Sequence, residues 1–288
     1  MKKSVYLNGD FVPVEKATVS VMDRGFLYGD GIFETIRAYG GVPFRWKKHF
    51  ERMAASAQTL GIEFNRSDGE LRESVTELLA RNELKDAYLR ISLSRGIHHG
   101  DLGLSPNGVP TLVITAGELN RPSDEEYENG VSAIILSRPC TSPLASHKTL
   151  SYLPYLAARH KANEVGARET LLCGPAGRMT EGTSSNLFIV LSDRVFTPPD
   201  DGTILPGITR KTVMDALHAS GIECMEDYFT SSEVYDADEV FITNSIIETL
   251  PVTRIGKAPV HNGKVGPIFK KALAAYRGEV RKELEGQV

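Results

Sequence analysis

Two residues in the middle of the chain have side chains suited to aldehyde and pyridine chemistry. Lys148 stands just before a predicted helix over 151–166, and Glu181 lies between predicted strands over 169–173 and 185–191. A lysine amine forms a Schiff base with an aldehyde once its pKa is low enough for the free amine to exist. A carboxylate that faces a pyridine nitrogen keeps the ring protonated, which makes the ring an electron sink. Taken singly, the lysine also fits a solvated surface charge and the glutamate an ordinary turn.

Two other stretches have the chemistry of a phosphate site. Arg52 lies on a predicted amphipathic helix over 46–60, and a guanidinium pairs bidentately with phosphate oxygens. Gly207, Ile208 and Thr209 open another predicted helix, whose backbone N–H groups and dipole favour an anion. Each of these features alone also fits a surface charge or an ordinary helix start.

The residues around these side chains resemble the class IV aminotransferases, which are pyridoxal-phosphate (PLP) enzymes of fold type IV. The motifs that carry the resemblance are His147-Lys148-Thr149-Leu150, Thr180-Glu181-Gly182-x-x-x-Asn186-Leu187-Phe188 and Leu205-Pro206-Gly207-Ile208-Thr209-Arg210. The group includes branched-chain aminotransferases, D-amino acid aminotransferases and aminodeoxychorismate lyases. The resemblance extends over nearly the whole chain.

The resemblance implies a PLP site made by several separate segments. It assigns Lys148 as the catalytic residue, which binds the aldehyde of PLP and transfers the substrate's α-proton, and it places Glu181 at the pyridine nitrogen. The cofactor-binding residues that it implies are Arg52, Lys148, Glu181, Gly207, Ile208, Thr209, Asn244 and Ser245. PLP is expected in a cleft between two domains. The active protein is expected to be a homodimer whose sites borrow a loop from the neighbouring subunit.

The resemblance also implies that Phe33 faces the substrate, that Arg24 lies near a partner subunit's site, and that the loop with His98 and His99 approaches the substrate. Arg37 is a further cationic candidate for binding the substrate carboxylate. The segment Asp-Arg-Gly-Phe-x-Tyr-Gly-Asp-Gly around Arg24 is more similar to D-amino acid aminotransferases and lyases than to branched-chain enzymes. The loop that contains both histidines, however, lacks the spaced Arg-x-His that binds the substrate carboxylate in standard D-specific enzymes. The carboxylate partner in this chain therefore stays open among these cationic residues.

These motifs favour transamination of an amino acid, with D-amino acids preferred and 2-oxoglutarate or pyruvate as the amino acceptor. An aminodeoxychorismate lyase, which releases pyruvate, is the first alternative. Thr35 replaces a glycine of branched-chain enzymes and recurs in lyases, and Asn244 stands where some lyases have asparagine. A branched-chain L-amino acid aminotransferase is the second alternative.

Length and resemblance together predict an α/β fold in two domains. Residues 1–119 are expected to form a smaller α/β domain, and residues 130–288 a larger, barrel-like domain that binds PLP. Residues 120–129, which are acidic and contain a proline, read as an interdomain linker.

Local signals define several elements. Asn8-Gly9 between two apolar stretches predicts an opening hairpin. Ser67, with Glu70 three residues later, predicts a capping box at the start of a helix over 68–81. Residues 87–94 alternate between apolar and polar, as in a half-exposed strand.

Composition excludes several protein classes. The 288 residues are 41% hydrophobic and 24% charged, as in ordinary globular proteins. The net charge of −4 and the lack of a long Lys/Arg run argue against nucleic-acid binding. We see no signal peptide and no stretch near the ~18 apolar residues that span a bilayer. Three scattered cysteines suit neither a disulfide framework nor a zinc site, so we expect a cytoplasmic protein without a metal.

Overall fold

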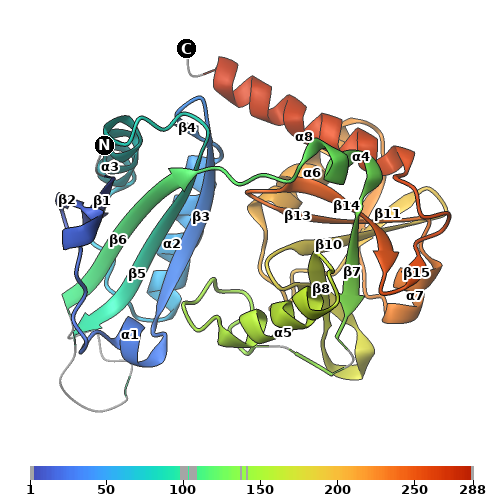
Figure 1. Ribbon diagram of the computed structural model, residues 1–288, viewed down its shortest axis with the longest axis horizontal. Coiled ribbons are helices and arrows are strands. Elements are labelled where there is room, and N and C mark those ends of the chain that lie inside the picture. The colour runs from blue at the N-terminus through green and yellow to red at the C-terminus, as the bar shows by residue number, and fades with distance from the viewer. Residues whose placement is uncertain (1–2, 98–102, 104–108, 137, 141, 287–288) are drawn as a thin grey trace. The chain divides into compact units, whose positions relative to one another are not determined.

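The chain forms two compact units in the computed structural model, which describes residues 3–97, 103, 109–136, 138–140 and 142–286 (Figure 1). The first unit comprises Met1–Asn120 together with His147–Tyr152, and the second comprises Arg121–Ser146 and Leu153–Val288. The short segment that contains Lys148 therefore belongs to the first unit, although most of the sequence around it belongs to the second.

The first unit is built on an antiparallel six-stranded sheet in the order β2-β1-β6-β5-β3-β4. Its strands are β1 (Ser4–Leu7), β2 (Asp10–Pro13), β3 (Gly31–Tyr39), β4 (Val42–Pro43), β5 (Ala87–Ile97) and β6 (Val109–Glu118). The predicted hairpin is confirmed, because Asn8 and Gly9 connect β1 to β2 with φ angles of 53° and 121°. Glycine tolerates such angles readily, and asparagine better than most residues.

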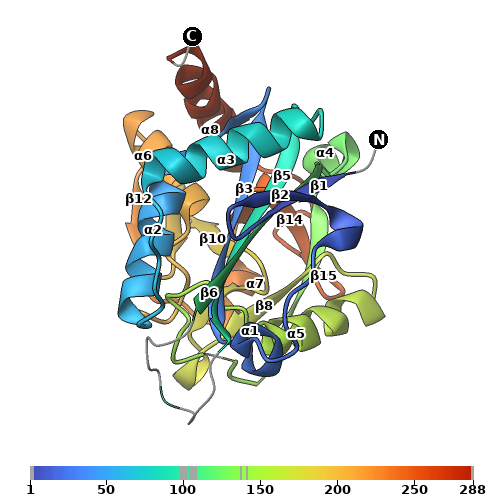
Figure 2. The same ribbon diagram turned by 90° about the vertical axis from the view of Figure 1, so that its left-hand side faces the viewer.

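Helices α2 (Trp46–Thr59) and α3 (Asp68–Arg81) cover one face of this sheet (Figure 2), while the short α1 (Arg24–Tyr28) precedes β3. The capping box at Ser67 and Glu70 is confirmed, since each side chain accepts a hydrogen bond from the other residue's backbone N–H. Ile36, Val75 and Leu89 are among the fully buried aliphatic side chains between helices and sheet. Because side chains alternate along a strand, the opposite face carries polar and aromatic residues.

The second unit contains a nine-stranded sheet that closes on itself. Its strands are β7 (Val131–Ile135), β8 (Glu169–Cys173), β9 (Met179–Gly182), β10 (Asn186–Leu191), β11 (Arg194–Thr197), β12 (Cys224–Glu226), β13 (Glu239–Asn244), β14 (Glu248–Ile255) and β15 (Ala258–Pro259). The order β10-β13-β14-β7-β8-β9 becomes a ring because β9 also pairs with β10. The predicted α/β class with a barrel-like second part is thus confirmed.

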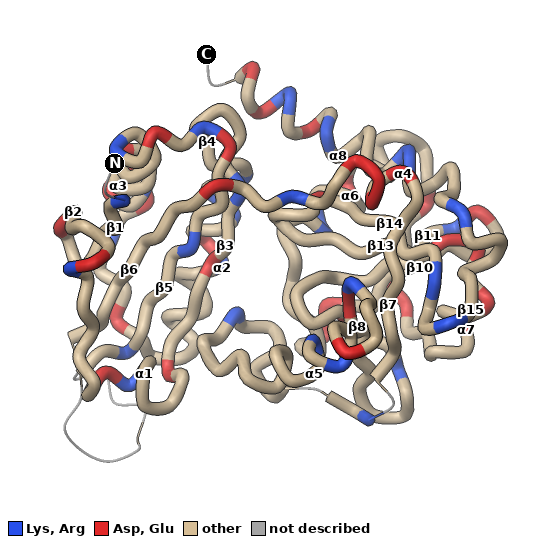
Figure 3. Tube along the Cα trace, viewed as in Figure 1, with Lys and Arg blue, Asp and Glu red and all other residues tan. Residues whose placement is uncertain are grey.

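Helices pack around this ring. They are α4 (Asp124–Asn129), α5 (Leu153–Glu164), α6 (Ile208–Ala219), α7 (Ser231–Asp236) and α8 (Pro267–Glu285). The long α8 packs against α6, β13 and β14, and acidic and basic residues alternate along its length (Figure 3). Beneath it the ring of Phe241 stacks on Phe188 with centroids 4.9 Å apart.

Two local predictions are refined by the structure. The helix predicted over 151–166 is present as α5, but it begins at Leu153, with Pro154 in the first turn, where a missing N–H matters little. Residues 124–129 of the predicted linker fold into α4, whose capping box is formed by Ser123 and Glu126. No helix in the described part of the chain is both long and apolar enough to cross a membrane.

Candidate active site

The segment around Lys148 is attached to the edge of β3. Phe33 N donates to Lys148 O, and Leu150 N donates to Gly31 O, both at 2.8 Å. Gly31 is needed for this contact, because a Cβ there would lie 2.6 Å from Leu150 Cδ1. Two backbone hydrogen bonds therefore fix the lysine backbone on the first unit's sheet.

The Lys148 side chain lies among aromatic and cationic groups. Its Nζ is 4.6 Å from the centre of the Phe33 ring, which also contacts the Tyr152 ring edge-on at 5.6 Å. The guanidinium carbon of Arg90 lies 3.7 Å from the same Phe33 ring centre. A lysine and an arginine thus share one buried aromatic ring on the sheet face opposite α2 and α3.

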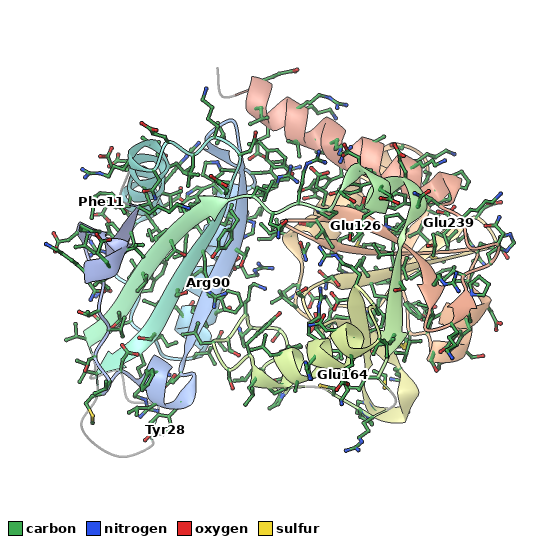
Figure 4. The ribbon with its side chains drawn as sticks, viewed as in Figure 1. Phe11, Tyr28, Arg90, Glu126, Glu164 and Glu239 are labelled. Atoms are coloured by element: carbon green, nitrogen blue, oxygen red, sulfur yellow. The ribbon has the colours of Figure 1, made fainter. Side chains whose placement is uncertain are left out.

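Arg90 is a functional candidate that sequence reasoning missed. It lies on β5 (Figure 4), and its Nε donates to Ser92 Oγ at 3.2 Å. Burial lowers its pKa, although an arginine keeps its charge at neutral pH. The alternation over 87–94 already placed Arg90 on the polar face of its strand, and that was the only sequence signal. Its neighbours Phe33 and Lys148 come from other segments.

Arg52 forms a buried ion-pair cluster with Glu34 and His49. Its Nε donates to Glu34 Oε1 at 2.8 Å and its Nη2 to Glu34 Oε2 at 2.7 Å, while His49 Nδ1 lies 2.7 Å from Glu34 Oε2. Burial raises the pKa of Glu34, but the charge of Arg52 and the hydrogen bonds with His49 and Arg52 outweigh this and hold it at about 2. Burial lowers the pKa of His49, so the neutral imidazole is favoured. The carboxylate fixes the direction of the Arg52 guanidinium.

The remaining substrate-binding predictions fall in different places. Arg24 is buried, and its Nε donates to Asp30 at 2.7 Å, a carboxylate that also binds Arg95. Arg37 is buried with its guanidinium carbon 4.2 Å from the Tyr39 ring centre. His98 and His99 lie outside the described residues.

In the second unit, Glu181 lies at the closure of the ring. Its carboxylate is buried, and its Oε2 accepts a hydrogen bond from Leu205 N at 3.0 Å. The phenol of Tyr155 also hydrogen-bonds to it, and burial together with the carboxylate's charge raises the pKa of Tyr155. Glu181 is thus an oriented carboxylate in a protected setting, as a pyridine-nitrogen partner requires.

The loop that follows Glu181 is organised by another buried carboxylate. Glu169 accepts hydrogen bonds from Thr183 N at 3.2 Å and from Ser185 Oγ at 2.9 Å, and it also binds the hydroxyls of Thr183 and Ser184. Arg159 Nη1 pairs with it at 2.9 Å. Glu169 was not singled out from the sequence, and its contacts explain how the turn between Glu181 and β10 holds its shape.

The start of α6 offers backbone donors. Gly207 is its N-cap residue and has no side chain that could cap the first N–H groups of the helix. The helix itself begins with Ile208 and the buried Thr209. Uncapped N–H groups and the helix dipole favour an anion at this end. Arg210 is buried and donates through Nη2 to Pro198 O at 2.7 Å, so its side chain anchors the first turn of the helix.

Asn244 and Ser245 form the turn between β13 and β14. Asn244 Oδ1 accepts from Ile246 N and Ile247 N, each at 2.9 Å, and its Nδ2 donates to Ser184 O at 2.9 Å. The asparagine therefore shapes the turn that presents Ser245 and ties it to the loop after Glu181. Its role toward a phosphate remains a prediction.

This chain is similar to known proteins over most of its length. The family model of amino-transferase class IV matches residues 31–255. The chain belongs to the class IV aminotransferases. It is 40% identical to a putative branched-chain-amino-acid aminotransferase of Methanocaldococcus jannaschii over 275 residues, 95% of each chain. It is 32% identical to the D-alanine aminotransferase of Bacillus licheniformis over 283 residues, 97% of this chain and 98% of the other.

A solved structure gives the same picture. The T.th. branched-chain amino acid aminotransferase with pyridoxamine 5'-phosphate superimposes with a TM-score of 0.89 at 30% identity, covering 96% of this chain and 93% of that chain. A class IV aminotransferase uses PLP, and this chain is accordingly a PLP-dependent transaminase. The relatives include both branched-chain and D-alanine aminotransferases, so they do not assign the stereochemistry of the amino acid substrate.

The residues of this class IV aminotransferase fit PLP. Lys148 is an amine beside an aromatic ring, Glu181 is a buried carboxylate, and Gly207 begins a helix that no side chain caps, which are the types of group that the aldehyde, ring nitrogen and phosphate of PLP require. When bound, PLP supplies an aldehyde and a ring that accepts negative charge. Glu181 would then hold the ring nitrogen protonated, the helix start at Gly207 would bind the phosphate, and the Lys148 amine would move protons.

Proposed function

We propose that the enzyme transfers an amino group between an amino acid and a 2-oxo acid such as 2-oxoglutarate or pyruvate. The observation that carries this proposal is the group formed by Lys148, Phe33 and Arg90. It combines an amine that can move a proton with a cation that can bind a carboxylate, both beside the Phe33 ring. An amino acid presents both an α-proton and an α-carboxylate, so it matches both groups.

Each residue has a defined part in this proposal. Lys148 binds PLP and transfers the α-proton, with the Phe33 ring beside it restricting its side chain. Glu181 faces the pyridine nitrogen, while Arg52, the Gly207–Thr209 helix start and the turn at Asn244 and Ser245 bind the phosphate. Arg90 joins the predicted candidates Arg24 and Arg37 for the substrate carboxylate. A buried carboxylate without a cationic or multi-donor partner would be costly.

We favour D-amino acids as substrates because the segment from Asp23 to Gly31 resembles D-specific enzymes. The branched-chain L-amino acid alternative is supported by the relative from Methanocaldococcus jannaschii, at 40% identity. The lyase alternative is supported by Asn244, because some lyases have asparagine at this position. In this chain its side chain accepts the hydrogen bonds that form the turn before Glu248. These three activities differ in their substrates and products, so assays of one protein preparation with each substrate distinguish them.

The test is a spectrophotometric half-reaction screen with D- and L-amino acids. Each substrate converts the PLP chromophore to that of pyridoxamine phosphate without an acceptor. We expect D-alanine or D-glutamate to react fastest. Fastest reaction with L-leucine, L-isoleucine or L-valine would assign the branched-chain activity instead. Pyruvate release from aminodeoxychorismate, at rates well above any transamination, would assign the lyase.

Arg37 and Arg90 give the test a residue-level arm. If they bind the substrate carboxylate, Arg37→Ala and Arg90→Ala should raise KM for amino acids far more than for a simple primary amine, which has no carboxylate. Equal changes for both substrates would contradict this role. Arg81→Ala, which removes an exposed guanidinium paired with Glu77, is the matched control.

We further propose that the enzyme is a homodimer that buries the surface around α1. Val21, Phe26 and Tyr28 expose 69%, 73% and 56% of their area. The segment is nevertheless held in place, because Asp23 accepts from Gly25 N, Ser94 Oγ and Thr111 Oγ1. Rigid, clustered apolar side chains at a surface are typical of a protein contact, and a second copy of this chain is the occupant we propose.

A further inference from the structure

Glu181 and Asn186 are the residues at which the strand ring of the second unit closes. Their pairing joins β9 to β10, and both side chains are buried, at 7% and 6% exposed. Residues directly opposite each other on antiparallel strands point to the same face of the sheet. The two side chains therefore lie side by side on one face of the ring.

Both side chains bind the same residue of the loop that leads into α6. Leu205 N donates to Glu181 Oε2 at 3.0 Å, and Asn186 Nδ2 donates to Leu205 O at 2.9 Å. Leu205 lies two residues before Gly207, the N-cap residue of α6. The Glu181 carboxylate and the helix start are thus linked through one residue, with Asn186 supplying the second of the two hydrogen bonds.

Gly207 shows how closely Asn186 packs against this loop. A Cβ at position 207 would lie 1.8 Å from Asn186 Oδ1, a separation that real Cβ atoms essentially never show. The φ of Gly207 is −69°, an angle open to any residue, so space and not backbone angle requires glycine here. The Asn186 amide is therefore in direct contact with the start of α6.

We propose that Asn186 is a positioning residue that sets the spacing between Glu181 and the start of α6. The inference rests on the proposed cofactor site, in which Glu181 faces the pyridine nitrogen and Gly207–Thr209 bind the phosphate. The ring and phosphate of PLP are joined by a short arm, so both ends bind well only when their protein partners stand at a matching separation. Without the Asn186 amide, the Leu205 carbonyl loses its hydrogen bond and the helix start is held less firmly relative to the carboxylate, although Leu205 N still donates to Glu181.

The experiment compares apo wild type and Asn186→Ala for binding of PLP and of pyridoxal, which has the same ring but no phosphate. We expect PLP affinity to fall about tenfold or more, since a lost buried hydrogen bond is worth about that much. Pyridoxal affinity should change much less, because pyridoxal does not use the helix start. Equal weakening of both ligands, or unchanged PLP affinity, would overturn the proposal.

Asn82→Ala is the matched control in the first unit. Asn82 Nδ2 likewise donates to a backbone carbonyl, that of Ser4, at 2.9 Å. Its loss should lower the free energy of unfolding without changing the ratio of PLP to pyridoxal affinity. A changed ratio in this control would show that the ratio reports general loosening, and the proposal would fail.

A second arm needs no cofactor. Gly207→Ala in the apo protein should lower the unfolding midpoint strongly, because the new methyl group meets Asn186. In the Asn186→Ala background that space is vacated, and the same substitution should lower the midpoint several-fold less. Strict additivity of the two substitutions would overturn the contact on which the inference depends. A wild type that bound no PLP would refute the proposed function, while this cycle would still test Asn186.

Discussion

At the scale of single residues, the chemistry depends on what surrounds each charged group. Lys148 is held beside the Phe33 ring, and the Glu181 carboxylate accepts a backbone N–H from Leu205. The Arg52 guanidinium is directed by Glu34. In each case a neighbour fixes the direction of the reactive group, so that little reorganisation is needed when cofactor and substrate bind.

The first residue-scale prediction concerns Lys148. Lys148→Ala should abolish both the visible absorption of bound PLP and turnover, because it removes the amine that the proposed function assigns to the aldehyde and to proton transfer. Borohydride reduction of the wild type followed by peptide mapping should label Lys148. A label on another lysine would show that the assignment is wrong.

The second concerns Glu181. Glu181→Gln should leave PLP bound but slow turnover by orders of magnitude, because a neutral amide does not keep the pyridine nitrogen protonated. Glu239→Gln is the matched control. Glu239 is also a buried carboxylate of the second unit, and it accepts from Ile268 N and Phe269 N at the start of α8. Near-normal turnover in Glu181→Gln would refute the role of the carboxylate.

The third concerns pH and Glu34. The pKa of Glu34 is held at about 2 in the folded chain instead of 4.5. Between pH 4.5 and 2 this carboxylate is therefore protonated in the unfolded chain but still ionised in the folded chain. The ion pair therefore contributes roughly 3 kcal/mol at neutral pH, and this is lost as the pH falls from 4.5 toward 2. The lowered pKa of His49 acts in the same direction below its ordinary value of 6.5.

The measurement is the free energy of unfolding of the apo protein against pH for wild type and Glu34→Gln. The gap between the two curves should narrow on acidification. Glu77→Gln, which alters an exposed pair with Arg81, should run parallel to wild type. Parallel curves for Glu34→Gln as well would contradict the depressed pKa.

At the scale of elements, the fold pairs each reactive residue with a secondary-structure element that can orient it. Helix α2 carries Arg52 and His49, which both pair with Glu34, and also Ser56, whose Oγ lies 3.0 Å from His147 Nδ1. One helix therefore contacts the Lys148 segment and carries the proposed phosphate ligand. The proposed function assigns the uncapped start of α6 to the same phosphate.

The element-scale prediction is that Arg52→Ala weakens PLP retention tenfold or more, with partial rescue by excess cofactor. Charge-assisted contacts to a partly buried phosphate are worth roughly 1.5–3 kcal/mol each, which accounts for that factor. Equilibrium dialysis of Arg52→Ala against wild type measures it, with Arg81→Ala on α3 as control. Unchanged PLP affinity would remove Arg52 from the phosphate site.

At the scale of the whole molecule, the exposed surface around α1 predicts self-association. Light scattering after gel filtration should give twice the chain mass of 31.6 kDa for the wild type. Phe26→Asp, which places a charge on the most exposed aromatic side chain of the surface, should shift the protein toward the chain mass. Val109→Asp is a control, because Val109 is 79% exposed on β6. A wild type at the chain mass would refute the dimer.

The sequence alone determined the family and several local elements, and it predicted the reactive lysine and glutamate. Lys148, Glu181 and the Gly207–Thr209 helix start lie in short motifs, and the Ser67–Glu70 capping box depends on residues three apart. Such signals are local, because helix caps, tight turns and strand alternation are set by neighbouring residues.

The tertiary structure alone decided which distant residues meet. It placed residues 147–152 on β3, brought Arg90 to the Phe33 ring, and closed the ring of strands at Glu181 and Asn186. These contacts depend on strand register and on loop closure between segments far apart in the chain. Strand register and loop closure cannot be inferred from a residue's neighbours in sequence, because register is set jointly by both strands and by the core they bury.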